Sequence, residues 1–436
     1  MFKSIRLENF KAYRDTGDVP LAPLTIVVGL NNSGKSTLLN AIFALKRTAQ
    51  DAAPTAALVT VAPGVNLNGF YDILHNGEMC EDKTFSISLA LDLPTETVVQ
   101  LGADAKPEKV QVPDRLSVSF GLGEKTRDIE VAKARFSLGS AKVLEVERGN
   151  GWFSDVLQDT DAVTFAFRNF IPMLVLSDKG RSTGPSQDLM NVLAKSSFHA
   201  FLWNHWIASL VHSIGPLRKR VPWSASVGAR APSEFGEGGE DLIAALRRDE
   251  RYPPHNRTLA ECLNYWISRK KILGRIHLEP DKTNTVHKLL GDEIEGPENI
   301  NVAGMGEGIS QILPIIARSY AASPHSCLLV EQPEIHLHPA LQADMADLFI
   351  DIATTLQRQV IVETHSEHLV LRVRRRIAEG TIDPNDVSIL YVEKQGAESK
   401  VRRLDINKRG HFDDWPEGFF DEAYQEAMAL AMATPK

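Results

Sequence analysis

The chain has 436 residues, 43% of them hydrophobic and 24% charged, and its net charge is −8. This length allows two or three structural units with a large core, and the acidic balance excludes a generally basic nucleic-acid coat but not a local basic patch. No apolar run approaches the roughly 18 residues of a membrane span, and the N-terminus, MFKSIRLENF, lacks the apolar stretch of a signal peptide. The three cysteines, Cys80, Cys262 and Cys327, show no metal-type spacing, so we expect reduced thiols in a cytoplasmic protein.

A phosphate-binding motif follows the first apolar run. Residues 24–28, LTIVV, are predicted to form a buried strand, and STLLNAIFALKR, which begins at Ser36, is predicted to form a helix. Between them GLNNSGKS, residues 29–36, fits the pattern G-x-x-x-x-G-K-[ST], in which backbone N–H groups and the helix N-terminus surround phosphates. Lys35 would reach the β- and γ-phosphates of ATP, and Ser36 would bind Mg²⁺. The expected nucleotide contacts in this loop are Gly29, Asn31, Asn32, Ser33, Gly34, Lys35, Ser36 and Thr37.

The middle of the chain divides into two patterns. Residues 84 to about 175 contain short alternating segments, such as FSISLALDL and RLSVSFGLG, which predict antiparallel strands. From about 187 to 290 the pattern is helical, with an exposed loop predicted at residues 228–240.

From about residue 308 the pattern alternates between helix and strand. We predict a helix at 310–321, a strand at 326–330, a helix at 340–356 and a strand at 359–363, an order typical of a parallel sheet with crossover helices. In NVAGMGEGISQILP, residues 301–314, we expect Ser310 to cap the first of these helices and Pro314 to fall in or just after its first turn. A glycine-rich turn before a capped helix can form a second anion site, but an ordinary capped helix explains this segment equally well.

Polar residues follow the predicted strands. Glu331 ends the strand in CLLVEQPEIHLHP and can help to hold Mg²⁺, whereas His365 comes just after the strand in VIVETHSEHL. Either residue alone could be a structural or surface side chain. Ligands of parallel α/β sheets bind beyond the carboxyl ends of the strands, and Gly29, Glu331 and His365 are all expected there.

These motifs, in this order, resemble an ATP-binding-cassette (ABC) ATPase of the SMC, RecF and OLD group, of the AAA-15 type. RLENFKAY with LTIVVGLNNSGKSTLLNAI resembles the N-terminal half of that cassette, GEGISQ its signature motif, EQPEIHLHP its Walker B motif and D-loop, and ETHS its His switch. SIGPLRKR, residues 213–220, resembles a segment common in OLD-like ATPases, and the C-terminal tail resembles a domain of bacterial relatives that often belong to anti-phage defence systems.

The resemblance implies an α/β fold: a P-loop NTPase of ABC type with a mixed central sheet, an antiparallel β subdomain and an inserted helical subdomain. The expected divisions are 1–83 and 296–380 for the ATPase core, 84–180 for the β subdomain, 181–295 for the helical insertion and 381–436 for a small C-terminal cap. ATP and Mg²⁺ are the implied cofactors. Two copies would close head to tail around two ATP molecules, so that Gly308, Ser310 and Gln311 of one copy face the γ-phosphate bound by Lys35 of the other.

Two features depart from the family. OLD nucleases carry a C-terminal Toprim nuclease domain, but only about 70 residues follow ETHS here, and the adjacent Asp413 and Asp414 lack the spacing of its Mg²⁺-binding cluster. We therefore expect no intrinsic nuclease and assign any cutting of nucleic acid to a separate effector. Second, Gln332 occupies the position that is usually the glutamate polarising the attacking water.

The second departure bears on catalysis. Glutamine can orient water, as it does in some GTPases, but it cannot accept a proton. Glu334 or His365 could supply the missing charge, so the expected catalytic residues are Glu331, Gln332, Glu334 and His365, with Ser36 and Glu331 as metal ligands. We favour slow hydrolysis and a long-lived ATP-bound state; the alternative is that Glu334 has taken over the role of base and that turnover is ordinary.

Four basic clusters stand out against the acidic chain: RKR (218–220), RRDER (247–251), RKK (269–271) and RVRRR (372–376). Arg372, Arg375 and Arg376 would share one helix face. The clusters could contact nucleic acid or an acidic partner. For each cluster alone, however, we favour a solvated helix face.

The leading hypothesis is a cytoplasmic Mg²⁺-dependent ATPase that forms a homodimer, or a larger even assembly, on binding ATP. It would regulate a separate effector, a nuclease or toxin, in bacterial defence. The rival is a DNA-binding maintenance protein like RecF, whose ATP-closed dimer clamps DNA. A P-loop kinase would leave the signature and His-switch motifs unexplained.

Overall fold

The computed structural model describes most of the chain. The described residues are 1–51, 56–62, 64–77, 83–93, 96–99, 108–124, 126–148, 152–153, 163–177, 181, 187–227, 236, 238–251, 257–416 and 420. Cys80 and most of the predicted loop at 228–240 lie outside them. Among the described residues no helix is long and apolar enough to cross a membrane, and Cys262 and Cys327 are not in disulfides.

Two compact units divide the chain, and each is assembled from segments that are distant in sequence. The first consists of Met1–Ala22, Ser33–Val211 and Glu393–Val401. The second consists of Pro23–Asn32, His212–Val392 and Arg402–Lys436. The boundary between them crosses the predicted phosphate loop after Asn32.

The first unit is organised by an eight-stranded sheet whose neighbouring strands are antiparallel, in the order β13-β12-β11-β10-β7-β1-β2 with β3 beside β1. Its strands are β1 (Phe2–Phe10), β2 (Tyr13–Asp15), β3 (Val19–Pro20), β7 (Phe85–Leu91), β10 (Arg115–Leu122), β11 (Ile129–Leu138), β12 (Ala141–Arg148) and β13 (Trp152–Phe153). Successive side chains of β10 point to opposite faces of the sheet. Leu116, Val118 and Phe120 are buried on one face, whereas Ser117 and Ser119 point to the more open face. The antiparallel strands predicted here are present.

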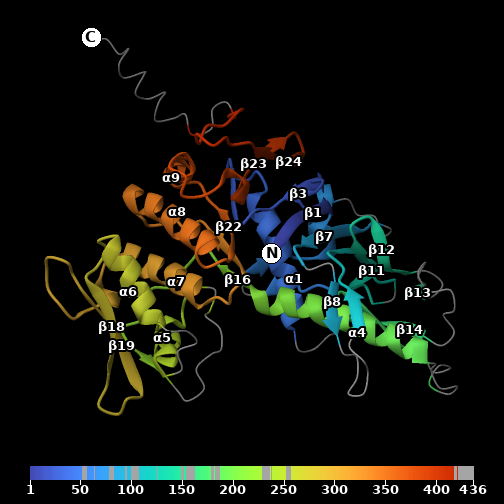
Figure 1. Cartoon of the computed structure of the whole chain (residues 1–436), viewed down its shortest axis with the longest axis horizontal. Helices are drawn as coiled ribbons and strands as arrows, with labels where there is room; N and C mark the ends of the chain where they lie inside the picture. Colours follow the sequence, from blue (N-terminus) through green and yellow to red (C-terminus); the bar gives the residue numbers. More distant parts are fainter. Residues whose placement is uncertain are drawn as a thin grey trace, which may run out of the picture. The chain divides into compact units, whose positions relative to one another are not determined.

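Two helices of the first unit pack together. They are α1 (Lys35–Gln50) and α4 (Gln187–Leu210) (Figure 1), and the Gln50 side-chain amide donates a hydrogen bond of 2.9 Å to the Ala208 carbonyl. The remaining short elements are β5 (Val61–Ala62), β6 (Val65–Asn66), α2 (Phe70–Ile73), η1 (His75–Gly77), β8 (Glu96–Val99), β9 (Glu108–Gln111), β14 (Val163–Arg168) and β15 (Ile171–Leu176).

The central sheet has six strands in the order β16-β21-β22-β4-β23-β24, and most of it belongs to the second unit. Its strands are β16 (Val211–Ile214), β21 (Cys327–Glu331), β22 (Gln359–Glu363), β4 (Leu24–Gly29), β23 (Val387–Gln395) and β24 (Glu398–Leu404). The pairs β21–β22, β22–β4 and β4–β23 are parallel. Every residue of β4 and β22 is buried, as expected for parallel strands covered on both faces.

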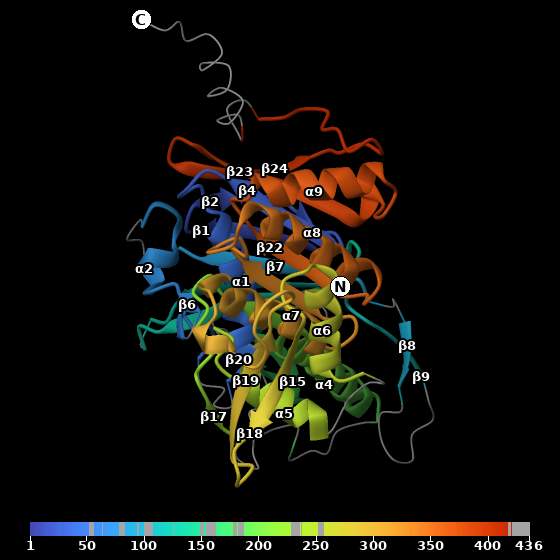
Figure 2. The same cartoon turned by 90° about the vertical axis from the view of Figure 1, so that its left-hand side faces the viewer.

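Crossover helices connect these parallel strands. α7 (Glu307–Ala321) precedes β21, α8 (Pro339–Thr354) joins β21 to β22, and α9 (Glu367–Ala378) leads toward β23. α8 and α9 lie side by side in both views (Figure 1; Figure 2). Two short turns, η2 (Val302–Gly304) and η3 (Pro384–Asp386), complete this region. The predicted helix–strand alternation after residue 308 is therefore confirmed, and the strand predicted at 359–363 has the same bounds as β22.

The segment predicted to be helical also contains strands. Its helices in the second unit are α5 (Leu242–Arg251) and α6 (Leu259–Arg269), but an antiparallel sheet of β17 (Ala225–Ser226), β18 (Arg275–Pro280), β19 (Val286–Asp292) and β20 (Ile300–Asn301) accompanies them (Figure 1). The β18–β19 hairpin turns at Asp281, whose carboxylate accepts hydrogen bonds from the N–H groups of Thr285 and Val286. An aspartate that binds backbone N–H groups in this way favours a turn, so Asp281 is the sequence feature that would have predicted the hairpin.

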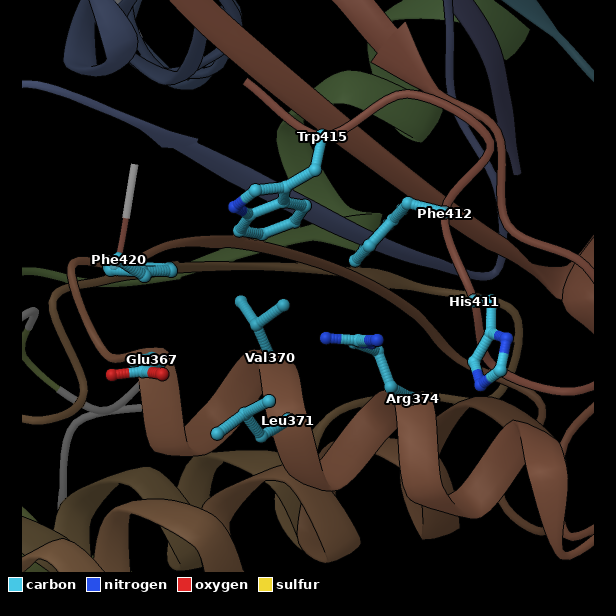
Figure 3. Close-up of a pocket in the computed structure, with 8 residues that line it drawn as sticks. All are labelled: Glu367, Val370, Leu371, Arg374, His411, Phe412, Trp415 and Phe420. Atoms are coloured by element: carbon cyan, nitrogen blue, oxygen red, sulfur yellow. The ribbon is translucent and has the colours of Figure 1, made fainter. Parts of the chain in front are cut away.

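The C-terminal segment packs on α9 and leaves a cavity of about 550 Å³. Figure 3 shows Val370 and Arg374 of α9 directed toward the rings of Phe412 and Trp415. The Arg374 guanidinium lies 5.1 Å from the centre of the Phe412 ring, and its Nε donates a 2.8 Å hydrogen bond to the Gly410 carbonyl. Gly410 has a φ of +72°, and a Cβ there would lie 2.2 Å from the Arg374 carbonyl oxygen, so this close approach requires glycine.

An ion-pair network joins α8, α9 and Lys270, the residue that follows α6, and it includes three basic residues from two of the four clusters. Asp347 lies at its centre and binds Lys270 Nζ at 2.5 Å, Arg372 at 2.6 Å and Arg376 Nε at 2.7 Å. Its side chain is only 11% exposed. Burial alone would raise the pKa of Asp347, but hydrogen bonds from Arg376 and Lys270 outweigh that effect and lower the pKa to about 2.

We predict that Asp347→Asn lowers the free energy of unfolding at pH 7 by about 2 kcal/mol, because the pKa falls from 3.8 to about 2 on folding. A lowered pKa gives stability that is present above about pH 4 and is lost as the pH falls toward 2. Urea unfolding at pH 7 and at pH 3 measures both effects. Asp344→Asn is the matched control, because Asp344 pairs with Lys270 and Arg372 but not with Arg376. This variant should lose less free energy of unfolding than Asp347→Asn. Equal losses in the two variants would contradict this assignment.

Candidate active site

The predicted phosphate loop leaves the end of β4 and enters α1. Asn32 and Gly34 have φ values of +59° and +103°, so the chain turns sharply before the helix. A Cβ on Gly34 would lie 3.1 Å from Ser399 Oγ and 3.2 Å from Ala12 Cβ, while the Tyr13 hydroxyl donates to the Gly34 carbonyl at 2.9 Å. Positive φ and close neighbours together require glycine at this position.

The start of α1 is suited to an anion. Among the described residues no side chain caps this helix, and its first turn contains no acid, so the helix N-terminus keeps its partial positive charge. Lys35 is only 4% exposed. The Ser33 hydroxyl is buried and lacks a hydrogen-bond partner within the described part of the chain, and a phosphate oxygen would supply one.

The carboxyl ends of three strands coincide at one edge of the central sheet. Glu331 is in register with Glu363, and Glu363 with Val27, two residues before Gly29. The turns that follow β4, β21 and β22 therefore leave the sheet at the same edge, as the sequence predicted for Gly29, Glu331 and His365. Ligands of parallel α/β sheets bind at such edges.

Gln332 lies in an uncommon backbone conformation. Its φ is +44°, and its N–H donates a 2.8 Å hydrogen bond to the Glu363 carbonyl of the neighbouring strand. A non-glycine residue at positive φ persists only where its surroundings hold it. The turn after β21 is thus fixed against β22.

Glu334 connects the turn after β21 to the turn after β22. One carboxylate oxygen accepts a 2.8 Å hydrogen bond from Thr364 Oγ1, and the other accepts a 2.7 Å hydrogen bond from the His365 N–H. Thr364 N–H in turn donates to the Val27 carbonyl at 3.1 Å. Each carboxylate oxygen has a second lone pair, so these bonds do not exclude a bound water.

The segment predicted as a second anion site begins its helix earlier than expected. Gly306 is the N-cap of α7, so Ser310 lies within the helix, and the prediction that Ser310 caps it is wrong. The predicted position of Pro314 is wrong as well, because it lies about two turns into α7. Gly306 supplies the extended conformation that precedes a helix without needing a hydroxyl cap. Ser310 is 2% exposed and Gln311 is also buried, whereas Gly306 and Glu307 are exposed; Gly308 is intermediate.

Arg218 is the functional candidate that the sequence analysis missed. We treated it as part of a basic cluster, but its side chain is only 6% exposed. Burial lowers the pKa of its guanidinium to about 10, against the opposing effect of the Glu334 charge, so it stays protonated at neutral pH. The guanidinium donates to Gln311 Oε1 at 3.2 Å and to the carbonyls of Glu331 and Gln332 at 3.4 and 3.1 Å. Its position in SIGPLRKR, the segment that resembles one of OLD-like ATPases, was the sequence feature that could have identified it.

Four other basic residues of the clusters pair with acids. Lys219 pairs with Glu240, Arg220 with Glu307, Arg247 with Glu250 and Arg375 with Glu379. The favoured interpretation of each cluster as a solvated helix face is wrong for the first cluster, because Arg218 is buried and residues 218–220 do not lie in a helix.

These features define a mixed α/β fold with a P-loop sequence between a buried strand and a helix. The chain belongs to the AAA ATPase domain family, whose model matches residues 1–151 and 255–370, more than half of the chain. Residues 382–430 match a second family, DUF3696, whose function is unknown. No curated protein matches the chain.

Solved structures of SMC heads resemble the chain at low identity. An SMC head bound to the C-terminal winged-helix domain of ScpA is 13% identical, with a TM-score of 0.47 and coverage of 93% of this chain and 98% of that chain. The SMC head domain from Thermotoga maritima is 10% identical, with a TM-score of 0.40 and coverage of 93% and 99%. A head with an extended coiled coil, bound to the C-terminal domain of ScpA derived from Pyrococcus furiosus, is 10% identical, with a TM-score of 0.43 and coverage of 99% of each chain. These identities are too low to transfer an activity or a partner.

We predict that Glu334→Gln and Glu334→Ala separate two roles of this residue. A glutamine can still accept from the His365 N–H and can donate to Thr364 Oγ1, so it preserves the connection while removing the charge. If Glu334 mainly holds the turn, Glu334→Gln retains ATP turnover within about threefold, and Glu334→Ala loses more than about tenfold. Steady-state kcat measures both. Equal, large losses in both variants would instead identify Glu334 as the general base.

Proposed function

We propose that the chain is a Mg²⁺-dependent ATPase that acts as a switch. Two copies would close head to tail around two ATP molecules, and the closed state would regulate a separate effector protein. The observation that carries this proposal is the register of β21, β22 and β4, which brings the ends of these strands at Gly29, Glu331 and Glu363 to one edge of the sheet. That edge is where nucleotide-dependent α/β proteins carry out their chemistry.

The residues at this edge fit ATP and Mg²⁺. Gly29 to Thr37 would surround the phosphates, with Lys35 opposite the β- and γ-phosphates, and the Ser33 hydroxyl would gain the partner it lacks among the described residues. Ser36 and Glu331 offer the hard oxygen ligands that Mg²⁺ prefers, and Mg²⁺ usually takes few protein ligands beside substrate phosphates and waters. When bound, the ion neutralises charge on the β- and γ-phosphates.

Slow hydrolysis follows from the chemistry of Gln332. Its side-chain amide can orient a water but cannot take its proton. The N–H of Gln332 binds the Glu363 carbonyl, and the carbonyl of Gln332 binds Arg218. These two hydrogen bonds hold the backbone from which the Gln332 side chain extends. We favour a long-lived ATP-bound state. The alternative remains that Glu334 serves as the base and that turnover is ordinary.

Closure would use the exposed start of α7. Because Ser310 and Gln311 are buried within the chain, the backbone at Gly306, Glu307 and Gly308 is the more accessible part of the signature segment. The charge of Glu307 is compensated by Arg220, and the Glu307 carboxylate lies 3.5 Å from Nδ1 of His336. ATP would favour the closed dimer only through contacts of this kind that the open state lacks.

An effector protein is the favoured target of this switch. The rival function, ATP-dependent clamping of DNA as in RecF, needs cations available to phosphates. The paired basic residues described above weigh against it, although pairing does not forbid exchange of partners. A role in bacterial anti-phage defence rests on the resemblance of the sequence. Strong, salt-sensitive DNA binding that requires ATP would favour the rival, whereas a tight complex with a nuclease or toxin would favour the switch.

We predict that Gln332→Glu raises kcat for ATP at least about tenfold, because the new carboxylate can accept the proton of the attacking water. Wild-type chain with ATP should turn over slowly and form a dimer by light scattering. Lys35→Ala is the control and should lose nucleotide binding and dimerisation together. Brisk wild-type turnover that is unchanged in Gln332→Glu would show that the catalytic base lies elsewhere.

A further inference from the structure

Arg218 joins two motifs that are about a hundred residues away from it in sequence. Its Nε donates to Gln311 Oε1 at 3.2 Å, and Gln311 Nε2 donates back to the Arg218 carbonyl at 3.1 Å. The same guanidinium donates to the carbonyls of Glu331 and Gln332 at the end of β21. One planar group therefore fixes α7, which carries the signature segment, to the turn that carries Gln332.

The connection continues to the turn after β22. The charge of Glu334 acts on Arg218, and the Glu334 carboxylate binds Thr364 and His365. Hydrogen bonds therefore run from Gln311 through Arg218 to the Gln332 carbonyl and from the Gln332 N–H to the Glu363 carbonyl of β22, and Glu334 binds the turn that follows β22. Such a series can transmit a shift of α7 to the hydrolytic residues, because buried hydrogen bonds cannot be lost without a large penalty.

In the head-to-tail dimer proposed above, the two ends of this series of contacts face different ATP molecules. In that dimer the start of α7 faces the ATP of the partner, whereas Glu331, Gln332 and His365 of the same chain face its own ATP. We propose that Arg218 is a positioning residue that couples the two ATP sites of the closed dimer, so that occupation of one site orders the catalytic turn of the other. This inference rests on the proposed function.

Arginine is suited to this task and lysine is not. The four acceptors of Arg218 are Gln311 Oε1 of α7, the carbonyls of Glu331 and Gln332 at the end of β21, and the nearby Gly215 carbonyl. A guanidinium presents five donors in a fixed plane, whereas an ammonium is a point charge on a flexible stem. Burial also excludes Arg218 from direct contact with nucleic acid, which was one of the functions considered for its cluster.

The test compares Arg218→Met with Arg358→Met. Arg358 is a matched control: it is also buried, and it binds the same helix near its other end, donating to the carbonyls of Ser319 at 2.6 Å and Ser323 at 3.3 Å. ATP turnover and equilibrium binding of the fluorescent analogue mant-ATP are measured against nucleotide concentration, with thermal unfolding of each variant. Mant-ATP binding gives a Hill coefficient that does not depend on the rate of hydrolysis.

In the wild type we expect a Hill coefficient approaching two, the number of sites. Arg218→Met should bring it to about one and lower kcat about tenfold, with half-saturation changed less than about twofold, because Arg218 does not belong to the phosphate loop. Arg358→Met should keep the wild-type coefficient even where it lowers the unfolding temperature. Met is chosen because it has a similar length and introduces no new charge; both substitutions leave buried carbonyls without a donor, so thermal unfolding measures the loss of stability in each variant.

Three results would overturn the coupling. They are a wild-type coefficient of one, an unchanged coefficient in Arg218→Met, and the same loss of coefficient in Arg358→Met; the last two would make Arg218 a stabilising residue only. The proposed function fails in a different way, through a wild-type chain that does not bind mant-ATP or that binds it and remains monomeric by light scattering. If Arg218→Met does not fold, Gln311→Leu removes the same connection from the side of α7 and should produce the same loss of coefficient.

Discussion

Parallel hydrogen bonding among β21, β22 and β4 is the constraint on which the rest of the second unit depends. Because Glu331 pairs in register with Glu363, and Glu363 with Val27, each strand delivers its following turn to the same edge. A slip of one residue would turn the side chains of a strand to the opposite face of the sheet. The buried apolar side chains of β4 and β22 oppose such a slip, so core packing fixes the positions of residues that take no part in the core.

Polar contacts then fix the turns that the strands bring together. Gln332 N–H binds the Glu363 carbonyl, Thr364 N–H binds the Val27 carbonyl, and Glu334 spans two turns. Burying the guanidinium of Arg218 is unfavourable by itself, and four carbonyl or amide oxygens offset the loss of water. The net contribution of a buried arginine to stability is small or unfavourable, but its hydrogen bonds fix the positions of the groups that it contacts. We therefore assign Arg218 a positioning role.

Much of this architecture could be predicted from local sequence. Apolar runs of β-branched residues located β4 and β22, and glycines with a following lysine located the phosphate loop. Three features could not be found this way. The start of α7 at Gly306 depended on backbone conformation rather than on the hydroxyl of Ser310. The β18–β19 hairpin depended on turn chemistry at Asp281. The role of Arg218 depended on carbonyl groups more than a hundred residues away, which no local pattern contains.

The departure from the family pattern at Gln332 combines a firmly held backbone with an amide side chain. At Gln332 a residue at positive φ is held by a neighbouring strand and by Arg218, and its amide side chain cannot accept a proton. A strained positive φ at a non-glycine residue persists only where several surrounding contacts hold the backbone in place. A protein selected for rapid hydrolysis would gain from a carboxylate here. A protein whose ATP-bound state is its active form gains more from a well-ordered site that empties slowly, and the rigid turn with an amide side chain suits the second requirement.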